Sequence, residues 1–182
     1  MLIEKEKLEM LISYEEMQKK IGEVAEKINR DYAGESLTVV GILKGAVLFY
    51  SDLVRRLAPD VQFDFMTISS YGDSTESTGE VKIRKDLDSS ISGKNVLIVE
   101  DIIDTGLTLT NLKEILSTRK PKSLKICCML DKPSRRKVEI VPDYCCFEIP
   151  DRFVIGYGLD YAQSCRQYKD IYFVKPEYVD TL

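Results

Sequence analysis

The segment from 99 to 110, VEDIIDTGLTLT, contains the side chains best suited to chemistry. An apolar run ends at two acids, Glu100 and Asp101, and the string DTGLT follows at 104–108. A glycine turn that opens a helix directs backbone N–H groups and the positive end of the helix toward one point, which suits a phosphate. Adjacent carboxylates suit sugar hydroxyls or Mg²⁺, which prefers oxygen ligands. Because a solvated acidic turn explains an isolated acid pair better, the prediction depends on the whole string.

The composition excludes several other chemistries. The 182 residues include no His, so Ser-His-Asp catalysis, Cys-His catalysis and zinc sites built on imidazole are excluded. Proton transfer near neutral pH therefore falls to a carboxylate, Lys, Tyr or Cys. The formal net charge of -4 disfavours broad nucleic-acid binding, but it permits an anionic small substrate if cations gather locally or a metal assists.

Length and composition are typical of one soluble domain, 1–182, in the cytoplasm. The N-terminus MLIEKEKLEM is too charged for a signal peptide, and no apolar run approaches the length of a membrane span. The cysteines form no CxxC motif, and we expect them to be small buried hydrophobes in a reducing compartment: Cys127, Cys128, Cys145, Cys146 and Cys165.

Apolar periodicity predicts alternating helices and strands around the acids. A capping-box pattern at Ser13 and apolar residues at steps of three and four predict a helix over 14–32, and further helices are expected over 46–57 and 107–117. Strands are expected over 37–43, 61–68, 95–100, 123–130, 144–149, 152–155 and 171–174. The strand–helix–strand unit from 95 to 130 implies a parallel, right-handed crossover. The alternation predicts an α/β fold with a central parallel sheet flanked by helices.

The polar segment 69–80, SSYGDSTESTGE, cannot support a packed core. Structureless loops of about a dozen residues are uncommon in compact domains and often serve as lids over a site. A plain surface connection explains the composition equally well, so composition alone leaves both interpretations open.

The acidic string resembles the phosphoribosyl pyrophosphate (PRPP) motif of the type I phosphoribosyltransferases. The resemblance covers about residues 8–174 and indicates the hypoxanthine phosphoribosyltransferases within that family. It implies the type I phosphoribosyltransferase fold, with a core over about 14–149 and a small hood made by about 1–13 and 150–182. It also implies that ribose and the 5′-phosphate are bound by Glu100, Asp101, Asp104, Thr105, Gly106, Leu107 and Thr108. Leu107 occupies a place that is Lys in some members, so only its backbone N–H is available to the phosphate.

The resemblance also assigns the rest of the site. It implies that pyrophosphate is bound by Arg166 and by the loop Leu43, Lys44 and Gly45, in which the Leu43–Lys44 peptide is cis. Ser70 and Tyr71 open a flexible lid. In the purine site, Phe153 stacks on the base and Lys132 donates a hydrogen bond to a 6-oxo group. The Val154 backbone contacts the ring edge, and Asp160 lies near the base. Residue type alone gives ordinary structural explanations for the same positions. Lys44, Lys132 and Arg166 could be surface cations, Gly45 a glycine at a helix start, and Phe153 a core aromatic.

The implied reaction joins hypoxanthine, and guanine, to PRPP and forms IMP or GMP with release of pyrophosphate. This is a purine salvage reaction. It implies Mg²⁺ held by Glu100, Asp101 and Asp160, and Asp104 as the group that takes a proton from the purine. The implied partners are PRPP and a 6-oxopurine, with no nucleic acid or membrane, in a homo-oligomer (dimer or tetramer).

Three alternatives stay open at this point. A PRPP-binding regulator of the same fold would contact RNA or DNA through a basic cluster: Lys132, Arg135, Arg136 and Lys137. A transferase for xanthine or adenine is the second, although Lys132 is expected to disfavour the 6-amino group of adenine. The third is a Mg²⁺-dependent phosphohydrolase that uses the acid pair and needs no base acceptor.

Overall fold

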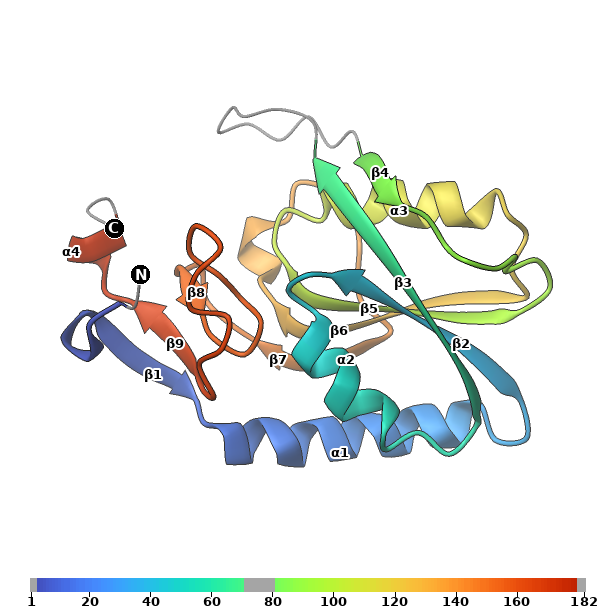
Figure 1. The fold of residues 1–182 in the computed structure, drawn as a ribbon, viewed down its shortest axis with the longest axis horizontal. Coiled ribbons are helices and arrows are strands. Elements are labelled where there is room, and N and C mark those ends of the chain that lie inside the picture. The colour runs from blue at the N-terminus through green and yellow to red at the C-terminus, as the bar shows by residue number, and fades with distance from the viewer. Residues whose placement is uncertain (1–2, 71–80, 180–182) are drawn as a thin grey trace.

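The computed structural model describes residues 3–70 and 81–179 as a large sheet with helices on both faces and a small sheet at one end (Figure 1). The large sheet has the order β4-β3-β2-β5-β6-β7. Its strands are β2 (Ser36–Leu43), β3 (Asp60–Ser70), β4 (Val81–Lys85), β5 (Asn95–Ile103), β6 (Ser123–Asp131) and β7 (Tyr144–Glu148). All neighbours from β3 to β7 are parallel, which confirms the predicted α/β fold with a central parallel sheet.

The edge strand β4 is the exception to the parallel arrangement. It pairs antiparallel with β3, and Ser70 and Val81 are partners at the open end. The pattern VKIRK predicts no strand by itself, because it is short and three of its five residues are charged. Charged side chains are common on edge strands, where they discourage pairing with other chains.

The helices pack on both faces of the large sheet: α1 (Tyr14–Asp31), α2 (Val47–Val54) and α3 (Leu107–Ser117). α1 begins at the predicted capping box, in which the Ser13 N–H donates to the Glu16 carboxylate at 2.8 Å. α1 and α2 cover one face and α3 covers the other, each over its own apolar core (Figure 1). α2 ends at Val54 rather than at the predicted 57. Pro59 disfavours helical backbone just before it, and the chain tightens into turns with bonds three residues apart.

A three-stranded antiparallel sheet, the hood, gathers both ends of the chain (Figure 1). Its order is β1-β9-β8, with β1 (Leu8–Ile12), β8 (Val154–Ile155) and β9 (Ile171–Val174). A 3₁₀ turn (Lys5–Lys7) precedes β1, and a short α4 (Pro176–Val179) follows β9. The sequence pattern does not predict β1, because only Ile12 is buried in it. The proposed division into core and hood at 13 and 150 stays a prediction.

No helix in the described ranges is long and apolar enough to cross a membrane. All five cysteines are free thiols. Four are buried, as predicted, and Cys145 is partly exposed.

Candidate active site

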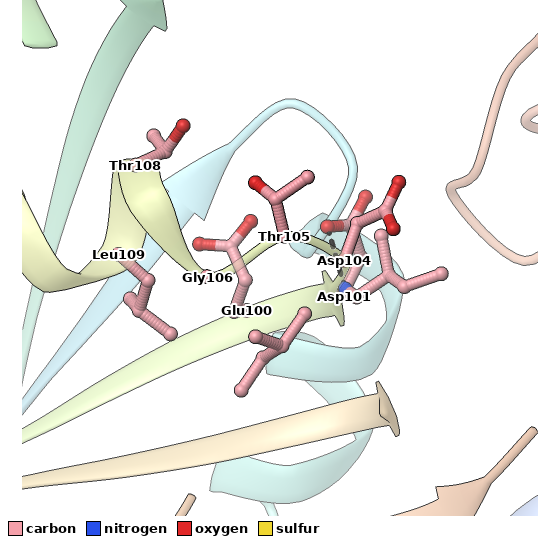
Figure 2. Close-up of a pocket in the computed structure, with 9 residues that line it drawn as sticks. Glu100, Asp101, Asp104, Thr105, Gly106, Thr108 and Leu109 are labelled. Atoms are coloured by element: carbon pink, nitrogen blue, oxygen red, sulfur yellow. Dashed lines mark hydrogen bonds between the residues drawn. The ribbon is translucent and has the colours of Figure 1, made fainter. Parts of the chain in front are cut away.

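A recess of about 210 Å³ opens where β5 ends and α3 begins. Figure 2 shows the oxygen atoms of Glu100, Thr105 and Thr108 on the same side of β5, with Asp101 and Asp104 at the end of the strand. All five residues line the recess. The predicted acids at the end of a strand and the predicted helix start therefore line one concave surface.

Gly106 makes the turn between the recess and α3 possible. It is the N-cap of α3 with φ of 83°, and no side chain caps the helix. A Cβ at this position would lie 2.6 Å from Ile140 Cγ2, so packing and backbone conformation both require glycine. The N–H of Leu107 lies 3.4 Å from Thr105 Oγ1. A helix leaves its first N–H groups without partners inside the helix, and these N–H groups are suited to an anion in the recess.

Glu100 and Asp101 are recessed acids in contact with each other. Burial, then repulsion by Asp101, raises the pKa of Glu100 well above its ordinary value. Burial also raises the pKa of Asp101, although hydrogen bonds from Glu100 and from the Ile102 N–H, at 2.8 Å, oppose the rise. Two carboxylates this close need a proton, a hydroxyl or a cation between them.

This donor set fits Mg²⁺, because carboxylate oxygens are the protein ligands that this ion prefers. No three His, Cys, Asp or Glu side chains form a ready metal cluster within residues 3–70 and 81–179. A metal beside Glu100 and Asp101 would therefore complete its coordination with substrate oxygens and water, as Mg²⁺ commonly does.

Asp104 lies at the mouth of the recess and is paired with Arg135. The Arg135 Nε donates to Asp104 Oδ1 at 2.8 Å, and its Nη1 reaches Asp151 Oδ2 at 3.4 Å. The side chains of Asp104 and Arg135 are both 43% exposed, so this ion pair contributes little stability. Its significance is positional, because it joins the end of β5 to the segment that precedes Phe153.

Arg136 is a site residue that sequence reasoning missed. Its guanidinium donates to the carbonyl of Ile103 at 2.9 Å, to the carbonyl of Asp104 and to the Asp131 carboxylate. It therefore fixes the backbone of the turn that carries the acids. Backbone carbonyl acceptors cannot be recognised in a sequence, so the only sequence signal for this role of Arg136 was its place in the basic cluster at 132–137.

Most of the basic cluster at 132–137 is engaged by other parts of the molecule. Arg135 pairs with Asp104, Arg136 binds Asp131 and backbone carbonyls, Lys132 is only 6% exposed, and Lys137 is exposed. Salt-dependent binding to nucleic acid needs free cations at the surface. The structure therefore does not favour the regulator alternative.

The loop before α2 packs directly on the acid pair. The Leu43–Lys44 peptide is cis. A Cβ at Gly45 would lie 1.6 Å from Asp101 Oδ2, so only glycine allows the loop backbone to approach this carboxylate. The Lys44 Nζ donates to Gln163 Oε1 at 3.3 Å. Glycine at a helix start is unremarkable in sequence, and only the tertiary contact reveals the constraint on Gly45.

A hood loop covers Gly45 from the other side. Gly158 has φ of 101°, and a Cβ there would lie 2.0 Å from the Gly45 carbonyl oxygen. The Arg166 guanidinium donates to the Gly158 carbonyl at 2.7 Å and pairs with Asp160 at 2.8 Å. The Arg166 Nε is buried and has no hydrogen-bond partner among the described residues. This loop therefore brings Asp160 and Arg166 to the predicted pyrophosphate loop.

The predicted purine residues form the neighbouring wall. Burial lowers the pKa of Lys132, although Asp104 and Asp151 oppose the effect, and its Nζ lies 3.9 Å from Asp151. Phe153 is 37% exposed, and its ring meets the edge of Tyr161 at 5.8 Å. Val154 is buried at the start of β8. Phe153 is thus partly exposed, and Lys132 is a buried cation.

The predicted lid is only partly described. Ser70 is the last residue of β3, where its backbone pairs with Val81. Tyr71 lies outside the described residues.

Comparison with known proteins identifies the family of this chain. The family model for the phosphoribosyl transferase domain matches residues 9–162. The hypoxanthine-guanine phosphoribosyltransferase of Bacillus subtilis is 50% identical over 167 residues, which are 92% of this chain and 93% of that protein. The chain belongs to the hypoxanthine-guanine phosphoribosyltransferase family.

Solved structures of this phosphoribosyltransferase family agree with the fold. The crystal structure of a hypoxanthine phosphoribosyltransferase from Staphylococcus aureus has a TM-score of 0.92 at 48% identity, over 96% of this chain and 95% of that chain. A hypoxanthine-guanine phosphoribosyltransferase from Bacillus anthracis, with HEPES in its active site, has a TM-score of 0.88 at 50% identity, over 91% and 98%. The chain is a transferase enzyme of purine salvage, as members of this family are.

Proposed function

We propose that this chain transfers the phosphoribosyl group of PRPP to hypoxanthine and guanine, forming IMP or GMP and pyrophosphate. The observation that carries the proposal is the close packing of Gly45 between Asp101 and Gly158. Through it, a loop suited to a diphosphate meets an acid pair suited to a sugar, beside the N-terminus of α3. A 6-oxopurine then fits between Lys132 and the exposed Phe153.

The phosphosugar is held by the recess. The N–H groups at the start of α3, with the hydroxyls of Thr105 and Thr108, bind the 5′-phosphate. Glu100 and Asp101 accept hydrogen bonds from the ribose hydroxyls. Because Leu107 offers only its backbone N–H, the phosphate depends on these neutral donors and the helix end.

Pyrophosphate is bound on the hood side of Gly45. Lys44 and Arg166 supply the positive charge, and the unpartnered Nε of Arg166 supports this role. Mg²⁺ bound at Glu100 and Asp101, and a second ion at Asp160, would act as Lewis acids that offset charge on the leaving pyrophosphate.

Asp104 takes the proton that the purine loses as the new glycosidic bond forms. Its pairing with Arg135 keeps it at the mouth of the recess, and its charge acts on the nearby Lys132. Lys132 donates to the 6-oxo group, Phe153 stacks on the ring, and the Val154 backbone contacts the ring edge. A buried lysine with a lowered pKa and acidic neighbours is a good donor to a neutral carbonyl.

The test is an assay of five bases with PRPP and Mg²⁺, in which nucleotide monophosphate is separated and quantified. Hypoxanthine and guanine should give product, adenine and a pyrimidine should not, and xanthine should be slower. Release of pyrophosphate without base, or no nucleotide from any purine, would overturn the proposal. A matched reaction with EDTA tests the dependence on magnesium.

We also propose that the chain works in the cytoplasm as a dimer or tetramer. Three apolar residues of α2 and β3 are exposed, which supports an interface there: Val47 41%, Leu48 38% and Phe63 61%. Light scattering of the purified chain that gives a monomer mass at micromolar concentration would contradict the assembly.

A further inference from the structure

Asp52 is a buried acid on α2 that has no part in the chemistry above. It is only 7% exposed, and its carboxylate accepts hydrogen bonds from the Tyr157 hydroxyl at 2.6 Å, from Gln18 at 2.7 Å and from Arg55. Arg56 donates to the Asp52 carbonyl and to the Gln18 side-chain oxygen, each at 2.6 Å. The cluster therefore ties α1 and α2 of the core to one tyrosine of the hood.

Tyr157 is held firmly by this cluster. Tyr157 is 4% exposed, and its ring and that of Tyr14 form a T-shaped pair with centroids 6.4 Å apart. Its backbone adopts a φ of 49°, between Gly156 at 96° and Gly158 at 101°, and its N–H donates to the Tyr168 carbonyl at 2.9 Å. Such a positive φ in a tyrosine persists only where surrounding contacts fix it.

The residue after Tyr157 is the one that touches the pyrophosphate loop. The Gly158 backbone packs on the Gly45 carbonyl, and the Gly158 carbonyl accepts the Arg166 guanidinium at 2.7 Å. The Gly158 N–H donates to the Arg166 carbonyl at 2.9 Å. A shift of Tyr157 would therefore move both the surface that supports Gly45 and the base of Arg166.

We infer that Asp52 is a positioning residue for pyrophosphate and PRPP, acting through the Tyr157 hydroxyl to hold the hood loop on the Gly45 loop. The inference rests on the proposed function for its choice of ligand. Hydrogen bonds to the ionised Asp52 outweigh the burial that would raise its pKa, so the carboxylate is a strong acceptor for Tyr157. Among the described residues, Lys132 of the proposed purine site makes no hydrogen bond or ion pair with this cluster.

The decisive variant is Tyr157→Phe, which removes one hydroxyl and keeps the ring. We expect its KM for PRPP, and for pyrophosphate in the reverse reaction, to rise about tenfold, while the KM for hypoxanthine and the kcat stay within about twofold. Asp52→Ala should give the same split, and Tyr157→Phe in that background should add no further loss. If Asp52→Ala does not fold, Tyr157→Phe decides alone.

Two controls separate position from general loosening. Tyr172→Phe removes another hood hydroxyl, one that donates to Asp170 at 3.0 Å, and should leave all KM values unchanged. Arg55→Met removes the largely exposed partner of Asp52 but keeps the Tyr157 bond, and should do the same. Equal changes in the KM for PRPP and for hypoxanthine, or no change in Tyr157→Phe, would overturn the inference.

Hydrogen exchange tests the inference without activity. Tyr157→Phe should speed amide exchange in peptides covering 43–50 and 154–168, and leave those of β5 and β6 unchanged. If Tyr157→Phe exchanges faster but the wild-type chain has no transferase activity, the proposed function is wrong and the positioning role of Asp52 stands. If the wild-type chain is active but exchange in Tyr157→Phe is unchanged, the positioning role alone is wrong.

Discussion

Recessed carboxylates occur in two regions that connect to the Gly45 loop. At the end of β5, Glu100 and Asp101 share hydrogen bonds with each other, and burial raises the pKa of both. On α2, Asp52 has three donors, and these outweigh burial and lower its pKa. An acid whose partners are all in the chain stabilises the fold, whereas an acid pair left to share its charge is prepared for a ligand.

Asp104 stands between the two kinds, since it is exposed and has one cationic partner. If it serves catalysis rather than the fold, Asp104→Asn should lower kcat by about 10²–10⁴ and leave PRPP affinity and stability nearly unchanged. Steady-state kinetics, PRPP titration calorimetry and thermal melting measure the three quantities. Near-normal turnover would move Asp104 into the structural group.

The acid pair should show function and stability changing in opposite directions. Glu100→Gln and Asp101→Asn each remove charge from a crowded site, so the free chain should melt at the same or a higher temperature. The affinity for PRPP with Mg²⁺ should fall by about 10–100-fold, as expected when a metal's oxygen ligands are weakened. Calorimetric binding beside thermal melting tests this. A clear drop in melting temperature would show that these acids stabilise the fold.

Asp52 should behave in the opposite way. Asp52→Ala leaves the buried Tyr157 hydroxyl and Gln18 amide without their acceptor, and should lower the free energy of unfolding by about 1–3 kcal/mol. The matched control is Asp86→Ala, which breaks the more exposed pair with Arg119 at 2.7 Å and should cost less than about 1 kcal/mol. Urea unfolding compares them, and equal losses would remove the contrast between buried and exposed acids.

The smallest effect is the pH dependence of that stability. Because the pKa of Asp52 is lower in the folded chain than in the unfolded chain, the unfolded chain binds more protons, and stability rises with pH in that window. The advantage of wild type over Asp52→Ala should be constant above the ordinary Asp value of about 3.9 and shrink as the pH falls below it. Urea titrations at several pH values measure it, and an advantage that grew on acidification would contradict the sign.

The long periodic elements were predictable from sequence, and so were the short strands β7, β8 and β9, whereas β4 and β1 were not. α1 is predicted by its capping box and long apolar stripe, and β5 by the unbroken apolar run before its acids. β4 and β1 were missed, because VKIRK contains only two apolar residues and β1 buries only Ile12. The end of α2 differs by a few residues, because the chain after Val54 turns with hydrogen bonds three residues apart while the apolar pattern continues to Leu57.

Sequence order alone was enough to predict the α/β fold, the acidic string that ends a strand, and the glycine turn that opens α3. These follow from local order, because a strand, its acids and the next helix are adjacent in the chain. Tertiary structure decided which distant segments meet: Gly45 against Asp101, Gly158 against Gly45, and Arg135 on Asp104. The two glycine contacts join segments far apart in the chain and depend on missing side chains, and the Arg135–Asp104 pair joins two separate segments through their side chains. Local sequence order carries no pattern for any of these contacts.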